Sequence, residues 1–89
     1  MLDRLRQKVR SGNYVMTIHA EEEMNFDEFT IFDVENAILK GSIIERQKEA
    51  DSGEFKYILE GPSLTNRIVG IVTKLSQTNK LVIITVYEA

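Results

Sequence analysis

His19 is the residue of this sequence best suited to moving protons. It is the only histidine in the chain, and an unperturbed histidine has a pKa of about 6.5, close to neutral pH. Glu22 and Glu23 follow it at three and four residues. On a helix this spacing makes the side chains neighbours, so either carboxylate could orient the imidazole or raise its pKa. The alternative is a histidine that only caps a helix or packs on a sheet.

Arg67 and Tyr87 are two further candidates for chemistry. Arg67 opens an apolar stretch and Tyr87 closes another, so both polar tips can project from the rim of a core. An arginine binds phosphate through two parallel hydrogen bonds, and a tyrosine hydroxyl can position a nucleotide. Together with His19 they form a candidate catalytic set of a proton carrier, a fixed cation and a positioning hydroxyl, which suits phosphodiester cleavage.

We expect this catalytic set to converge in one shallow cleft, because strand ends and element junctions let polar side chains reach solvent together. Glu23 or Glu45 should lie near enough to orient the histidine. Thr85, two residues before the tyrosine, is a third candidate for an orienting role.

The sequence favours no metal or other cofactor. It contains one histidine and no cysteine, whereas zinc sites usually take several such ligands. A carboxylate site for Mg²⁺ or Mn²⁺ between Glu21 and Glu28 is the alternative to a solvated acidic helix face, and the solvated face is the simpler explanation. The five glycines are scattered and form no phosphate-binding loop.

Length and composition predict one globular domain over residues 1–89. A chain of 89 residues holds one small core, and the absence of cysteine excludes a disulfide scaffold. The longest apolar run, Leu81 to Tyr87, is too short to cross a bilayer, and no apolar stretch of signal-peptide length follows the N-terminus. We therefore expect a cytoplasmic protein with no membrane contact.

The charge is unevenly distributed along the chain. A net charge of −3 disfavours binding to nucleic acid, which normally requires an excess of basic residues. However, seven acidic residues and no basic residue lie between Glu21 and Glu35, whereas the first ten residues carry four bases and one acid. The acidity therefore need not cover the whole surface.

Two helices are predicted before residue 25. Leu2, Leu5 and Val9 repeat at helical spacing among charged residues. Asn13 to His19 alternates in the manner of a short extended segment, and the following Ala20 to Met24 is rich in helix formers.

The clearest helix signal covers Ile31 to Lys40. Thr30 can cap its beginning with Asp33 in the capping-box position, and Gly41 can end it in a left-handed conformation. An apolar stripe, including Val34 and Ile38, faces one side.

The second half predicts strands separated by turn-forming residues. The expected strands are Ser42 to Lys48, Glu54 to Glu60, Arg67 to Leu75 and Lys80 to Tyr87. The last two are apolar on both faces and should be central in their sheet. The predicted fold is therefore α+β, with short N-terminal helices packed on a four-stranded antiparallel meander.

A set of short motifs resembles the family catalogued as domain of unknown function 4258. The motifs are Gly12-Asn13-Tyr14, Thr17-Ile18-His19-Ala20, Glu23-Met24, Asp33-Val34-Glu35, Ala37-Ile38, Gly41-Ser42-Ile43-Ile44-Glu45 and Ile84-Thr85-Val86-Tyr87-Glu88. The likeness covers nearly the whole chain. Family members commonly carry an arginine shortly after the Glu-Met pair, whereas Asn25, Phe26, Asp27 and Glu28 follow it here.

The resemblance implies a pattern of helices before a small antiparallel sheet that is similar to ribonuclease toxins of the BrnT and RelE type. A metal-independent endoribonuclease of a toxin–antitoxin pair would have RNA as substrate and a small antitoxin protein as partner. The alternative is a non-catalytic module that binds a protein, or a second copy of itself as a homodimer, through an exposed sheet edge or helix. Both functions remain open at this point.

Overall fold

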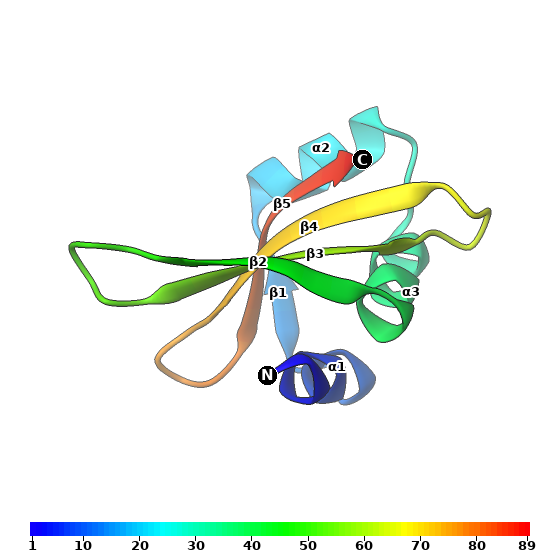
Figure 1. Cartoon of the computed structure of the whole chain (residues 1–89). Coiled ribbons are helices and arrows are strands. Elements are labelled where there is room, and N and C mark those ends of the chain that lie inside the picture. Colours follow the sequence, from blue (N-terminus) through cyan, green and yellow to red (C-terminus); the bar gives the residue numbers. More distant parts are fainter.

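The computed structural model describes all residues from Met1 to Ala89. Three helices and five strands form one sheet with the strand order β1-β5-β4-β3-β2 (Figure 1). The elements in chain order are α1 (Leu2–Arg10), β1 (Tyr14–Met16), α2 (Ile18–Phe26), α3 (Ile31–Lys40), β2 (Ser42–Lys48), β3 (Phe55–Pro62), β4 (Ile68–Leu75) and β5 (Leu81–Glu88).

The sheet is mixed and five-stranded, so the prediction of four antiparallel strands was incomplete. Strands β2 to β5 are antiparallel neighbours as expected, and β4 and β5 are both interior. The fifth strand is β1, which pairs in parallel with the beginning of β5 through Tyr14 opposite Leu81 and Met16 opposite Ile83. The apolar β5 thereby gains a second neighbour. The short alternating segment could be recognised locally, but its partner lies far along the chain.

The core lies on one face of the sheet, beneath α1 and α3. Alternate residues of the strands point into it, including Leu59 of β3, Ile71 of β4 and Ile83 of β5, each with no exposed surface. Helix α3 contacts β3 and β4, and its predicted core residues Val34 and Ile38 are fully buried. Figure 1 shows α1 and α3 on the same side of the sheet. None of the three helices has both the length and the apolar character that crossing a membrane requires.

The beginning of α3 has the predicted capping box and one further contact. The Asp33 carboxylate accepts the Thr30 backbone N–H at 2.8 Å and the Thr30 hydroxyl at 3.1 Å, while Thr30 Oγ1 accepts the Asp33 N–H. The other carboxylate oxygen accepts the Leu64 N–H at 2.8 Å, which docks the loop between β3 and β4 on the helix. The hydrogen bonds from Thr30, with that from Leu64, hold the pKa of Asp33 below its usual value.

Gly41 ends α3, but not in the predicted left-handed conformation. Its φ is −92°, within the range of ordinary residues. A glycine is needed for space instead, because a Cβ at this position would lie 2.7 Å from the Cα of Gly61. The close approach brings the end of α3 against β3.

Candidate functional site

Helix α2 lies along the outer edge of β5, beyond the point where β1 ends (Figure 1). Thr17 caps the helix by accepting the Ala20 N–H and donates its hydroxyl to the Ile84 carbonyl at 3.2 Å. Further along, the Glu23 carboxylate accepts the Val86 N–H at 3.3 Å. The helix thus satisfies backbone groups that a neighbouring strand would otherwise bond, and it carries its side chains to the end of β5.

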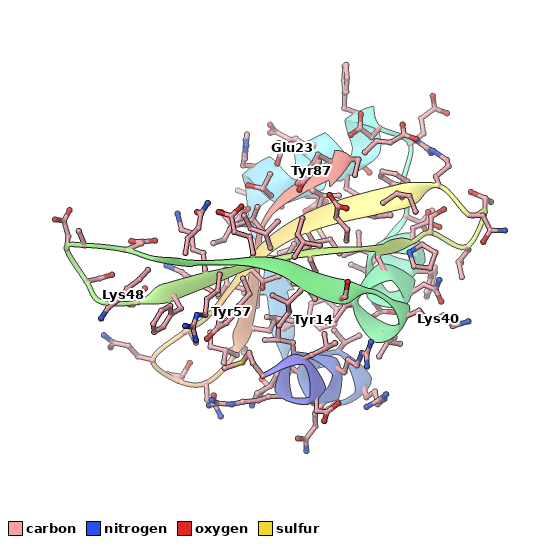
Figure 2. The ribbon with its side chains drawn as sticks, in the orientation of Figure 1. Tyr14, Glu23, Lys40, Lys48, Tyr57 and Tyr87 are labelled. Atoms are coloured by element: carbon pink, nitrogen blue, oxygen red, sulfur yellow. The ribbon has the colours of Figure 1, made fainter.

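A pocket of about 320 Å³ opens between α2 and the end of β5. We call it the α2 pocket. Figure 2 shows Glu23 and Tyr87 close together there. Its lining residues come from both elements and from the end of the helix: His19, Glu22, Glu23, Phe26, Asp27, Val86 and Tyr87. Three residues predicted for the site, one histidine, one carboxylate and one tyrosine, therefore meet in it.

His19 and Glu23 form a pair at the rim of the α2 pocket. The Nε2 atom of His19 lies 3.3 Å from Oε1 of Glu23, and the two side chains are 71% and 30% exposed. The same carboxylate oxygen accepts the Val86 N–H, which restrains it. An ionised carboxylate only accepts hydrogen bonds, so its position favours the tautomer of the ring that carries a proton on Nε2 and leaves Nδ1 as an acceptor. Of the two carboxylates considered from the sequence, Glu23 is the partner.

Tyr87 of β5 lies directly opposite Gly70 of the neighbouring strand β4. Its ring covers that glycine so closely that a Cβ at residue 70 would stand 2.6 Å from Cε1 of the tyrosine. Burial raises the pKa of Tyr87, and the negative charges of Glu60 and Glu45 raise it further. The hydroxyl therefore remains protonated near neutral pH and can donate a hydrogen bond.

Arg67 does not line the α2 pocket. Its guanidinium makes two hydrogen bonds to Glu88, from Nε at 2.9 Å and Nη2 at 2.8 Å, and a third to the Asp27 carbonyl at 2.8 Å. It also stacks 4.1 Å from the centroid of the Phe29 ring. The hydrogen bonds from Arg67 lower the pKa of the Glu88 carboxyl. Arg67 is therefore already paired with Glu88. It contacts the lining residue Asp27 but does not itself reach the pocket.

Glu45 and Thr85 lie outside the pocket lining as well. Glu45 is exposed on β2, opposite Ile58, where its charge acts on the pKa of Tyr87. Thr85 is partly exposed on β5, opposite Val72. Of Glu23, Glu45 and Thr85, only Glu23 contacts His19.

Three lining residues, Phe26, Asp27 and Val86, were missed from the sequence. Phe26 is 87% exposed, and Asp27 accepts the Glu88 N–H at 3.1 Å through its carboxylate. The spacing could have indicated Phe26, because residues 19, 23 and 26 are separated by four and three positions and therefore share one helix face. An exposed aromatic residue within an acidic segment would have been the second clue.

The acidic side chains around the pocket form no metal centre. No group of three or more histidine, aspartate or glutamate side chains is arranged to hold a metal ion. The chemistry that the pocket offers is proton transfer by an imidazole with a fixed carboxylate, beside the aromatic side chains of Phe26 and Tyr87.

The fold and the site together define a small α+β domain with an imidazole–carboxylate pocket at the edge of a mixed sheet. The chain belongs to the family described as "Domain of unknown function (DUF4258)", whose model matches residues 16–88. The matched part includes α2, α3 and the whole of the antiparallel sheet. Searches of curated proteins and of solved structures found no match.

Proposed function

We propose that the chain is a toxin-like, metal-independent endoribonuclease of the cytoplasm, with His19 as its proton carrier. The observation that carries the proposal is the His19–Glu23 pair at 3.3 Å in one pocket with Tyr87. The resemblance to toxins of the BrnT and RelE type supports the same reaction class by analogy of fold pattern.

In the proposed reaction, Nδ1 of His19 takes the proton of a ribose 2′-hydroxyl. The 2′-oxygen attacks the adjacent phosphorus, and the bond from phosphorus to the 5′-oxygen breaks. Water supplies the proton that the leaving 5′-oxygen takes up, and His19 later returns its own proton to water. The products are a 2′,3′-cyclic phosphate and a 5′-hydroxyl, and no metal is required.

The neighbours of His19 have separate roles in this reaction. Glu23 orients the ring and places its negative charge 3.3 Å from Nε2 while the imidazolium exists. The protonated hydroxyl of Tyr87 donates to a non-bridging phosphate oxygen. Phe26 offers an exposed ring on which a base can stack. Arg67 is a positioning residue that holds Asp27 and Glu88 at the edge of the pocket.

A protein-binding module is the second candidate, and two observations favour it. The α2 pocket carries the acidic residues Glu22, Glu23 and Asp27 but no basic one apart from the histidine, and such a rim attracts a basic side chain more readily than a phosphate. In addition, β2 is an edge strand with no partner on its outer side, and its Ile44 is 50% exposed. An edge strand of this kind can pair with a strand of another chain or of a second copy.

The test is cleavage of single-stranded RNA by purified protein in the presence of a chelator. The endoribonuclease predicts cleavage with products that end in a 2′,3′-cyclic phosphate, together with growth arrest on induced expression. Intact RNA and unaffected growth would contradict it and favour the binding module. A neighbouring gene for a small DNA-binding protein would further support a toxin–antitoxin pair.

A further inference from the structure

A second pocket, of about 370 Å³, lies at the other end of the sheet. The beginning of α1, the beginning of β3 and the loop between β4 and β5 surround it, and its lining includes one basic side chain, one carboxylate, two aromatic rings and an amide: Arg4, Glu54, Phe55, Tyr57 and Asn79. Its volume falls in the lower part of the range of about 300–1,000 Å³ that is typical of ligand sites. Figure 2 shows Tyr57 and Lys48 in this region, well away from Glu23 and Tyr87. We call it the Phe55 pocket.

Two cations of β2 lie over the Phe55 ring, outside the pocket lining, and a third cation lines the pocket itself. The guanidinium carbon of Arg46 is 4.7 Å from the ring centroid, and Nζ of Lys48 is 5.7 Å from it. Arg46 and Lys48 are two positions apart on β2, so they project from the same face of the strand. Arg4 lines the pocket from α1, where its Nη2 donates to Oδ1 of Asn79.

None of these three cations forms an ion pair. Two carboxylates of this region form ion pairs with other lysines: Glu49 with Lys56 at 3.2 Å and Glu54 with Lys74 at 3.7 Å. Arg46 and Lys48 share one aromatic ring, which attracts each of them but does not cancel their mutual repulsion. An anion bound between them would relieve that repulsion. The uneven charge seen in the sequence therefore becomes a spatial separation: an acidic α2 pocket at one end and uncompensated cations at the other.

We propose that the Phe55 pocket, together with the two β2 cations beside it, binds single-stranded RNA. Arg4, Arg46 and Lys48 hold backbone phosphates, and a base stacks on the guanidinium plane of Arg46, which itself lies over Phe55. A positively charged groove combined with aromatic and arginine stacking surfaces is the usual arrangement for binding single strands. An acidic peptide would use the same cations but gains nothing from a stacking surface. The choice of RNA over another polyanion rests on the proposed function, whereas the anion site rests on the pocket alone.

The test is fluorescence anisotropy with a labelled oligouridine at low salt. His19→Ala protein is used throughout, so that cleavage cannot alter the probe. The site variant is Arg46→Gln with Lys48→Gln. The matched control is Arg10→Gln with Lys40→Gln, which removes the same charge from exposed helix residues that make no ion pair.

We expect the site variant to bind at least about 10-fold more weakly, and the control to change by less than about 3-fold. The slope of log affinity against log salt should also fall by about 1.4 in the site variant, because each phosphate contact to a single strand contributes roughly 0.7. If the site variant does not fold, as judged by circular dichroism, the His19→Ala parent protein is titrated with the oligouridine instead. Amide NMR signals of Phe55, Tyr57 and Asn79 should then shift, and those of the α2 pocket should shift less.

Three results would overturn the inference. They are an equal loss of affinity in both variants, no binding by the parent protein, and equal or tighter binding of an oligoglutamate peptide, which would indicate an acidic protein partner. A failure of the proposed function has a different signature. In that case the wild-type protein leaves RNA intact while the His19→Ala protein still binds the oligonucleotide through the Phe55 pocket.

Discussion

Replacing Gly70 by alanine should displace Tyr87 without unfolding the protein. The added Cβ would stand 2.6 Å from Cε1 of the tyrosine, whereas ordinary contact begins at 3.4 Å, so the ring has to move by roughly 1 Å. A flexible side chain can make that movement, and alanine suits a strand better than glycine. We therefore expect the free energy of unfolding to change by no more than about 1–2 kcal/mol.

The displacement should be visible in two measurements. The pKa of Tyr87 is raised by burial and by the charges of Glu60 and Glu45, so a ring moved toward solvent should titrate closer to its ordinary pKa in an ultraviolet titration of the phenolate. The titration is best made in a Tyr14→Phe background, because Tyr14 also titrates high. RNA cleavage should fall on the order of 10²-fold, the usual cost of a misplacement near 1 Å.

A Tyr87→Phe variant separates the hydroxyl from the ring, because it keeps the packing on Gly70 and loses only the donor. Cleavage should fall in both variants, but the fold should be undisturbed in Tyr87→Phe. An unchanged tyrosine titration and an unchanged cleavage rate in Gly70→Ala would refute the assigned position and role of Tyr87.

Three predictions concern stability. Ile38→Ala should lower the free energy of unfolding by roughly 2–5 kcal/mol in chemical denaturation because Ile38 is fully buried, and a loss below about 1 kcal/mol would contradict its place in the core. Asp33→Asn should cost about 1–3 kcal/mol at neutral pH. Because the pKa of Asp33 is lowered in the folded protein, its ionisation stabilises the fold at pH values above the usual aspartate pKa. This stability is lost as the pH falls through the folded pKa, so Asp33→Asn protein should lose less stability in acid than the wild type. Burial, with a hydrogen bond to Glu35, raises the pKa of Tyr14 from 10.0 to about 12. The stability that this shift contributes is present below pH 10.0 and is lost as the pH rises toward 12. In Tyr14→Phe protein, the free energy of unfolding should therefore fall less steeply with pH over this range.

Features encoded by neighbouring residues were predictable from the sequence. The capping box of Thr30 and Asp33 lies within four residues, and the stripe of Val34 and Ile38 follows one helical turn. The His19–Glu23 pair is also a local feature, since it needs only the spacing of a helix. These elements were predicted because helix geometry alone determines which side chains meet.

Features that depend on distant pairing could not be predicted. Val86 donates to Glu23 across 63 positions of the chain, and no local pattern shows that α2 will take the place of a strand beside β5. Arg67 and Tyr87 were correctly placed at strand ends, but the register of β4 and β5 determines which side chains they meet. Because Val69 lies opposite Glu88, the guanidinium meets that carboxylate and is not free for the pocket.

The most direct test of the proposed site is the single-turnover rate of RNA cleavage by His19→Ala protein in the presence of a chelator. Glu21→Ala is the matched control, since Glu21 lies on the same helix, is exposed and does not line the α2 pocket. We predict that His19→Ala lowers the rate by roughly 10²- to 10⁴-fold, the usual contribution of a general acid or base, and that Glu21→Ala leaves it nearly unchanged. An equal rate for wild-type and His19→Ala proteins would remove His19 from the mechanism and contradict the proposed catalytic site.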